Sequence, residues 1–148
     1  MRVPETRREQ AELARQYGIE GFCYWHYWFG NGRQLLQRPF QEVLASGEPD
    51  FPFCLAWANH SWEDKQFNKE GGNKMLMEQL YPGDEDYIAH FNAVLPAFKD
   101  PRYIRVNGEP LFMIYAPMKV PDIAHFYRTL AKTGRASWFP HSFCGAYQ

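Results

Sequence analysis

Two apolar runs of this sequence end in side chains that could bind a ligand rich in hydroxyl groups. The run Gly21–Phe29 ends in rings, and the run Phe51–Asn59 ends in an amide followed by imidazole, hydroxyl and indole groups. Neutral imidazole and amide groups can donate to and accept from hydroxyls, and aromatic rings can stack on the flat apolar faces of sugars. For any single ring, packing in the core is the alternative. The pattern predicts a binding surface made of Tyr24, His26, Trp28, Asn59, His60 and Trp62, bordered by Tyr115.

Chemistry on a glycosidic bond would require two carboxyl groups flanking the anomeric carbon. Glu63 and Asp64 follow the second apolar run and are expected to be solvated loop charges. Glu78 lies inside the apolar stretch Met75–Leu80, where a lone acid needs a partner or a function. An ion pair with a neighbouring strand and a role at the substrate are both open for Glu78, which is the weak catalytic candidate. No pair of carboxylates can be named from the sequence.

A metal site built from His26, His60 and Glu78 is a sharper alternative, since these residue types can bind zinc or iron. Their sequence spacing is not that of a metal-binding motif, so no metal and no cofactor are expected. Cys23 lies in the middle of an apolar run without a nearby base and is not expected to be a catalytic nucleophile. The remaining histidines, His90, His125 and His141, are expected at the surface or in the uncertain tail.

Composition narrows the class of protein. The net charge of the 148 residues is −1, and no run or stripe of Lys and Arg indicates a nucleic-acid surface. Residues 1–5 lack the apolar core of a signal peptide, and no apolar stretch approaches the roughly 20 residues of a membrane span. Cys23 and Cys54 lie in predicted strands and are expected to be buried thiols, with a disulfide as the alternative. These features favour a cytoplasmic protein.

The elements that must position these groups can be predicted in the first half of the chain. Alanines at helical spacing and a stop at Gly18 predict a helix over residues 4–17. Aromatic residues favour strands, so strands are expected at about 20–28 and 52–59. A helix over 33–45 lies between them, with a kink or break at Pro39. Residues 63–73 have no period and are expected to form a loop over the carboxyl end.

In the second half, a core strand is expected at 75–80, followed by a helix from Pro82 to Phe98 with apolar residues at helical spacing. Asn107-Gly108 predicts a hairpin turn between 103–106 and 111–115, the latter a core strand. A last helix is expected over 121–132. Alternating strands and helices predict an α/β fold with parallel strands and outer helices. Four or five strands do not close a (β/α)8 barrel, so a small open sheet and part of a barrel are both open.

Three segments resemble the WbsX-type glycosyltransferase family, also described as glycoside-hydrolase-family-99-like. They are Gly21–Phe29, Ser46–Asn59 and Leu95–Phe112, and the resemblance covers about residues 1–133. It implies a partial (β/α)8 barrel of the TIM type, carbohydrate as the substrate, and a role in bacterial polysaccharide metabolism such as O-antigen (lipopolysaccharide) biosynthesis. The chain is then a single incomplete domain, 1–148, with an uncertain tail at 135–148.

Two departures from the family pattern bear on activity. The Thr-Glu-Trp segment upstream and the Asn-Glu-Trp segment downstream, which corresponds to the family 99 carboxylates, are absent, and His60 stands where many members have Glu. The resemblance therefore implies that this chain supplies part of a sugar-binding mouth without the main carboxylate pair. A non-catalytic sugar-binding remnant or a gene fragment is the alternative, and a metal-dependent hydrolase a lesser one. Unpaired sheet edges predict self-association.

Overall fold

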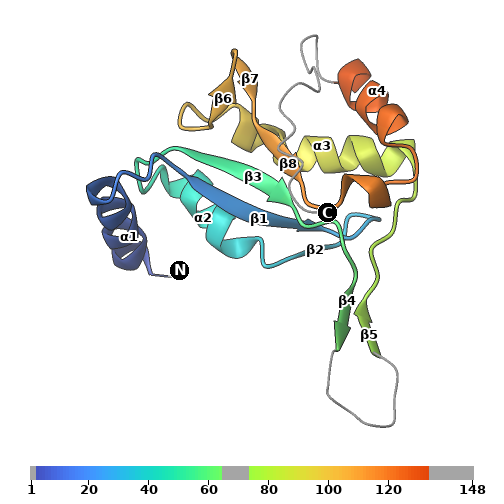
Figure 1. The fold of residues 1–148 in the computed structure, drawn as a ribbon, viewed down its shortest axis with the longest axis horizontal. Coiled ribbons are helices and arrows are strands. Elements are labelled where there is room, and N and C mark those ends of the chain that lie inside the picture. Colours follow the sequence, from blue (N-terminus) through green and yellow to red (C-terminus); the bar gives the residue numbers. More distant parts are fainter. Residues whose placement is uncertain (1–2, 65–73, 134–148) are drawn as a thin grey trace.

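The central sheet has four strands in the order β2-β1-β3-β8 (Figure 1). The computed structural model describes residues 3–64 and 74–133. Strands β1 (Phe22–Trp28), β3 (Phe53–Trp57) and β8 (Phe112–Ile114) run parallel, and β2 (Gln34–Leu35) pairs antiparallel with β1 at the edge. The predicted α/β class with parallel core strands is confirmed. Three strands are parallel, where four or five were predicted, and the sheet is not closed.

One face of the sheet is covered by helices. Residues paired in register share a face, and Tyr24, Leu55 and Phe112 form such a row. Tyr24 packs against Phe40 of α2 (Arg38–Ser46), and Phe112 packs against His90 of α3 (Asp84–Phe98). On the opposite face of β1, Cys23 is exposed and the Trp25 side chain is 52% exposed. The face opposite the helices is therefore open at β1, where we call it the open face, whereas all five residues of β3 are buried.

The first helix, α1 (Pro4–Gln16), confirms the predicted helix. Its proline lies at the first turn, where the missing N–H removes no intrahelical bond, and Gly18 beyond its end has φ 75°, the left-handed conformation expected of a stop. Ala11 and Ala14 pack against Phe51 at the start of β3. Figure 1 shows α1 at the amino ends of the strands, away from the carboxyl ends.

The second helix differs from the prediction. α2 begins at Arg38, and Pro39 lies in its first turn, so the proline starts the helix and causes no kink. The preceding residues Gln34–Leu35 pair with β1 as the short edge strand β2. The helix ends at Gly47, whose φ is 70°. The link from β1 to β3 is nevertheless a crossover through a helix, as parallel pairing requires.

The predicted core strand at 75–80 is wrong. Residues Lys74–Met77 form β5, which pairs antiparallel with β4 (Trp62–Asp64) in a hairpin that projects from the sheet (Figure 1). Met75 and Leu76 are exposed there. A short apolar run does not reveal whether it will be buried, and here a neighbouring segment supplied an antiparallel partner. The predicted loop therefore contains strand residues at 63–64, and 65–73 lie outside the described residues.

The last described part matches the prediction closely. α3 buries Tyr87, Phe91, Val94 and Phe98, as its spacing predicts. The turn Asn107-Gly108 has positive φ at both residues and joins β6 (Arg105–Val106) to β7 (Glu109–Pro110). The short helix η1 (Pro117–Lys119) follows β8, and α4 (Ile123–Thr133) packs on α3 through Phe126 and Tyr87. The uncertain tail at 135–148 lies outside the described residues.

Candidate functional site

A pocket of about 390 Å³ lies where β3 and β8 end. Its lining comes from the segment after β3, the start of β4, the residue after β8 and η1. The lining residues are His60, Ser61, Trp62, Glu63, Tyr115 and Lys119. Parallel strands bring their carboxyl ends to one edge, which is where α/β proteins bind ligands. The sequence prediction that the functional groups follow the strands agrees with this position.

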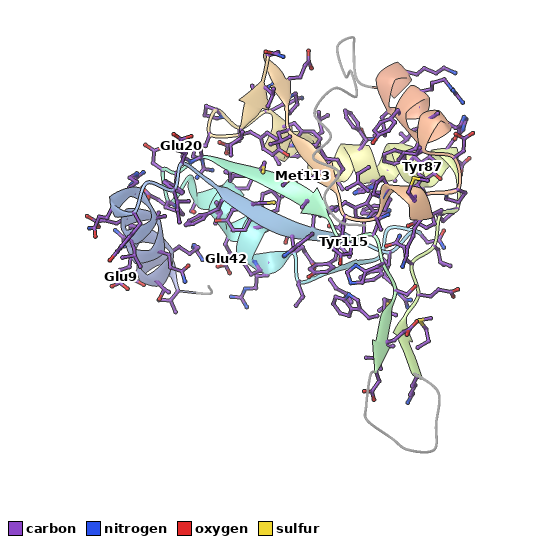
Figure 2. The ribbon with its side chains drawn as sticks, viewed as in Figure 1. Glu9, Glu20, Glu42, Tyr87, Met113 and Tyr115 are labelled. Carbon is purple, nitrogen blue, oxygen red and sulfur yellow. The ribbon has the colours of Figure 1, made fainter. Side chains whose placement is uncertain are left out.

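The ring of Tyr115 forms the centre of an aromatic surface beside the pocket. Figure 2 labels Tyr115 close to the carboxyl ends of β1 and β3. Its side chain is 54% exposed, and its ring centroid lies 5.7 Å from Trp25 and 5.3 Å from His60. Trp25 belongs to the open face of the sheet. The pocket and the open face therefore meet at Tyr115, and together they expose ring faces to a ligand.

Trp62 lies on the other side of the pocket and is held by edge-on ring contacts. Its centroid is 5.2 Å from those of Tyr27 and Phe29, which continue from β1. The Ser61 hydroxyl next to it accepts a hydrogen bond from the Gln79 N–H at 3.0 Å. These contacts join the end of β1 to the β4–β5 hairpin. They keep Trp62 half-buried, with the rest of its surface facing the pocket.

Asn59 is fully buried and links the two strands that carry the pocket. Its Nδ2 donates to the carbonyl of Ala116 at 2.8 Å and to the Tyr81 hydroxyl at 3.1 Å, and its Oδ1 accepts from the Ala116 N–H at 2.7 Å. The Tyr81 hydroxyl also lies 3.2 Å from the Asn59 carbonyl. The amide is thus used inside the protein, and it positions His60 on one side and Tyr115 on the other.

The prediction that Tyr24, His26 and Trp28 lie on the same face as the pocket residues is wrong in placement. All three are buried and point to the helices. The His26 Nε2 lies 2.9 Å from the His90 Nε2, and the Trp28 indole N–H donates to Asp86 at 2.9 Å. Even-numbered residues of β1 share one face, and that face is the packed one. The predicted role of these residues at the substrate stays a prediction.

His90 was expected at the surface and is buried. Its ring stacks on Trp28, with centroids 4.9 Å apart and planes 8° apart. Burial lowers the pKa of His26 to about 4, and burial with the neighbouring His26 lowers the pKa of His90 well below its usual range. Both imidazoles are therefore neutral near pH 7. The signal was available, because His90 lies within the apolar stripe that includes Tyr87, Phe91 and Val94.

Glu78 does not belong to the pocket. It is exposed just beyond β5, so the lone acid in an apolar run is solvated rather than buried. Glu63 and Lys119 bring a carboxylate and an ammonium to the pocket instead. Within residues 3–64 and 74–133, no group of three or more His, Cys, Asp or Glu side chains could hold a metal ion. The alternative site of His26, His60 and Glu78 is contradicted, because His26 faces α3 and Glu78 lies in the hairpin.

Three further observations concern the cysteines and the membrane. Cys23 and Cys54 are free thiols. Cys54 is buried as predicted, but Cys23 is exposed. None of the helices in the described ranges has the length and apolar character that crossing a bilayer requires.

Comparison with known proteins gives the same family as the motifs. The profile of the family described as Glycosyltransferase WbsX matches residues 1–146, so the match extends beyond the limit near 133 that the motifs indicated. Two proteins named "Uncharacterized protein WxcX", from Xanthomonas campestris pv. campestris strains B100 and ATCC 33913, are each 37% identical over 124 residues. That region covers 82% of this chain and 17% of each relative, so the chain spans a small part of their length. No solved structure matches the chain.

Proposed function

Because this chain belongs to the WbsX glycosyltransferase family, we propose that its pocket is part of the sugar-binding mouth of a carbohydrate-active protein. A carbohydrate-related role is what membership of the family indicates. The observation that carries the proposal is the ring of Tyr115, half-exposed between Trp25 and His60 at the edge where β3 and β8 end. Rings of this kind offer a flat apolar surface, and the polar groups beside them can bind hydroxyls.

The residues of the pocket have different proposed roles. Tyr115 and Trp62 contact the faces of the sugar, while His60 and Ser61 exchange hydrogen bonds with its hydroxyls. Asn59 positions His60 and Tyr115 through its buried hydrogen bonds. The buried residues Tyr24, His26 and Trp28 act from behind the sheet, by docking α2 and α3 against β1.

We propose that the sheet is part of a (β/α)8 barrel of the TIM type. Three parallel strands with helices on one face support this, since the opposite face, open at Trp25 of β1, would correspond to the interior of such a barrel. The relatives are several times longer than this chain, which is consistent with further strands in the longer proteins. Polysaccharide metabolism such as lipopolysaccharide biosynthesis is the proposed setting, and the cytoplasm the proposed location, which the free thiols of Cys23 and Cys54 favour.

The chemistry of the pocket distinguishes two candidate functions. Hydrolysis of a glycoside requires two carboxyl groups near the anomeric carbon, and among the described residues that line the pocket Glu63 is the one carboxylate. Catalysis, including glycoside-hydrolase-like chemistry, would need a second acid from elsewhere. Sugar binding without catalysis is favoured by this single carboxylate.

Binding is tested with a panel of neutral and acidic oligosaccharides, measured by calorimetry on the folded 148-residue chain. For a sugar that the parent chain binds, Tyr115→Ala and His60→Ala should each lower the affinity at least about ten-fold, which is equivalent to about 1.4 kcal/mol. Tyr17→Ala is the matched control, because Tyr17 is an exposed tyrosine that caps α1, and α1 lies at the amino ends of the strands (Figure 1). Equal losses in Tyr115→Ala and Tyr17→Ala, or no sugar binding by a folded chain, would contradict the proposal.

Catalysis is tested separately with aryl glycosides, whose hydrolysis releases a coloured phenol. If Glu63 takes part, Glu63→Gln should abolish release and retain sugar binding, since the amide cannot act as an acid or base. Glu78→Gln is the control, because Glu78 lies outside the pocket. Sugar binding without any release by the parent chain would favour the second candidate.

A further inference from the structure

The cysteines Cys23 and Cys54 lie side by side in the sheet. They are register partners on the parallel strands β1 and β3, so both side chains project from the same face. That face is the one opposite the helices, because the flanking residues Tyr24 and Leu55 form the packed row. Neighbouring strands are about 4.8 Å apart, which is within the separation of Cα atoms that a disulfide can bridge.

The two thiols differ in environment. Cys23 is exposed and Cys54 is buried. Interaction with the neighbouring Cys54 side chain lowers the pKa of Cys23 despite its partial burial. The same contact, with burial, raises the pKa of Cys54 far above its usual range. Cys23 is therefore the accessible sulfur with more thiolate character, and Cys54 holds a proton beside it.

We propose that Cys23 and Cys54 form a peroxide-reactive dithiol site that closes reversibly into a disulfide between β1 and β3. The Cys23 thiolate attacks one oxygen of hydrogen peroxide, so that an S–O bond forms and the O–O bond breaks. The hydroxide that leaves takes a proton and becomes water. The Cys54 sulfur then attacks the sulfenic sulfur of Cys23, an S–S bond forms, the S–O bond breaks, and the Cys54 proton leaves with the hydroxyl as water. Two thiols are oxidised and one peroxide is reduced to two waters.

This site is distinct from the sugar pocket. Cys23 and Cys54 lie near the amino ends of their strands, whereas the pocket lies beyond the carboxyl ends. Cys23 needs no neighbouring base for this reaction, because the neighbouring thiol stabilises the thiolate. A thiol reagent acts on a nucleophile that is exposed and partly ionised, and Cys23 meets both conditions. Disulfides formed in a reducing compartment are transient, which suits a reversible site.

The test uses the 148-residue chain with Cys144→Ser, which leaves Cys23 and Cys54 as its cysteines. The folded protein is treated with a small excess of hydrogen peroxide, the remaining thiols are blocked with maleimide, and tryptic peptides are analysed by mass spectrometry. Cys23 lies in the peptide 16–33 and Cys54 in the peptide 34–65. We expect these two peptides to be covalently linked, with the loss of two hydrogens, and to separate after dithiothreitol.

Two variants identify the order of events. In Cys54→Ser, the Cys23 sulfenic acid should accumulate and be trapped by dimedone in the peptide 16–33. In Cys23→Ser, the buried Cys54 should give neither a dimedone adduct nor a link. For the parent in concentrated urea, the linking rate should fall at least about ten-fold, because the pairing of the strands no longer holds the sulfurs together. This urea comparison needs only the parent and decides the question even where a variant does not fold.

Several results would overturn the site. One is a folded parent in which both thiols stay reactive to maleimide after peroxide treatment. A second is a dimedone adduct on Cys54 instead of Cys23. A third is a linking rate that is as high in urea as in buffer. Loss of sugar binding alone would not bear on it, since the two sites share no residue.

Discussion

The side-chain amide of Asn59 and the backbone of Ala116 exchange two hydrogen bonds, at 2.8 and 2.7 Å. The pair joins the end of β3 to the end of β8 across 57 positions of sequence. Asn59 is fully buried and Ala116 half-buried, so both bonds are partly shielded from water. The geometry of the pocket depends on this contact, since His60 and Tyr115 are the chain neighbours of the two bonded residues.

Replacing Asn59 with Asp should destabilise the protein. The carboxylate would lose the donors to the Ala116 carbonyl and the Tyr81 hydroxyl, and it would place a charge in a fully buried position. We expect the free energy of unfolding in urea to fall by about 2–3 kcal/mol. Asn92→Asp is the matched control, because Asn92 is exposed on α3, and its effect should stay within about 0.5 kcal/mol. Equal effects of the two substitutions would show that the Asn59 bonds contribute little.

Acidification should destabilise the protein through the pair His26 and His90. The folded pKa of His26 is about 4, against an ordinary value of 6.5, so between these pH values the unfolded chain binds a proton that the folded chain does not. Stability is therefore complete above pH 6.5 and decreases as the pH falls towards 4, by about 3 kcal/mol for His26 alone. The lowered pKa of His90 acts in the same direction. Because one Nε2 donates to the other in their hydrogen bond, protonating the accepting ring at Nε2 breaks the bond.

Urea unfolding at a series of pH values measures this effect. The parent should lose stability between pH 6.5 and 4, and His26→Gln should show a flatter profile, since it removes one of the titrating groups. A parent whose stability is constant over that range would contradict the buried, neutral state of the pair.

Two tryptophans of β1 should respond differently to truncation. Trp28 is buried, stacks on His90 and donates to Asp86, so Trp28→Ala should cost about 3–5 kcal/mol. Trp25 is half-exposed on the open face, so Trp25→Ala should cost about 1 kcal/mol or less and act on ligand binding beside Tyr115. Unfolding and sugar binding are measured on both variants. A specific loss of binding in a stable Trp28→Ala protein would restore Trp28 to the binding surface.

The exposed rings of the open face should cause the chain to self-associate, which is also the outcome predicted from the unpaired edges of the sheet. Trp25 and Tyr115 are half-exposed there, and Met118 beyond β8 is almost fully exposed. We expect sedimentation velocity to show oligomers whose share rises with concentration. Trp25→Lys should shift the distribution towards monomer, because a charge on the face opposes pairing. Tyr17→Lys, on an exposed tyrosine outside this face, should not. A monomer at all concentrations would contradict the prediction.

Local features of the sequence were enough to predict most helices and the parallel pairing of the first two core strands. The spacing of Ala11 and Ala14 and the stop at Gly18 predict α1, and Asn107-Gly108 predicts the turn between β6 and β7. Both signals lie in residues that are neighbours in the sequence. The parallel pairing of β1 with β3 follows from the helix between them. The position of the site beyond the strand ends could be predicted in the same way.

The face that each residue of β1 presents was decided by the tertiary structure. In the run Tyr24–Tyr27, both the odd-numbered and the even-numbered residues are aromatic, so the sequence does not indicate which face of the strand the helices cover. In the structure, Tyr24, His26 and Trp28 lie on the covered face, where His26 contacts His90 of α3. Cys23 and Trp25 lie on the opposite face and are exposed.

The partner of a strand and the environment of a lone acid were likewise decided by contacts distant in sequence. Residues 74–77 paired with Trp62–Asp64 in a hairpin rather than entering the sheet, which moved Glu78 into solvent. By itself, the sequence determined most of the helices, the parallel pairing of β1 with β3 and the kinds of groups at the strand ends, because these depend on local spacing and on connection order. Only the tertiary structure determined which of those groups meet at the pocket, because burial and pairing are settled by segments that the sequence keeps far apart.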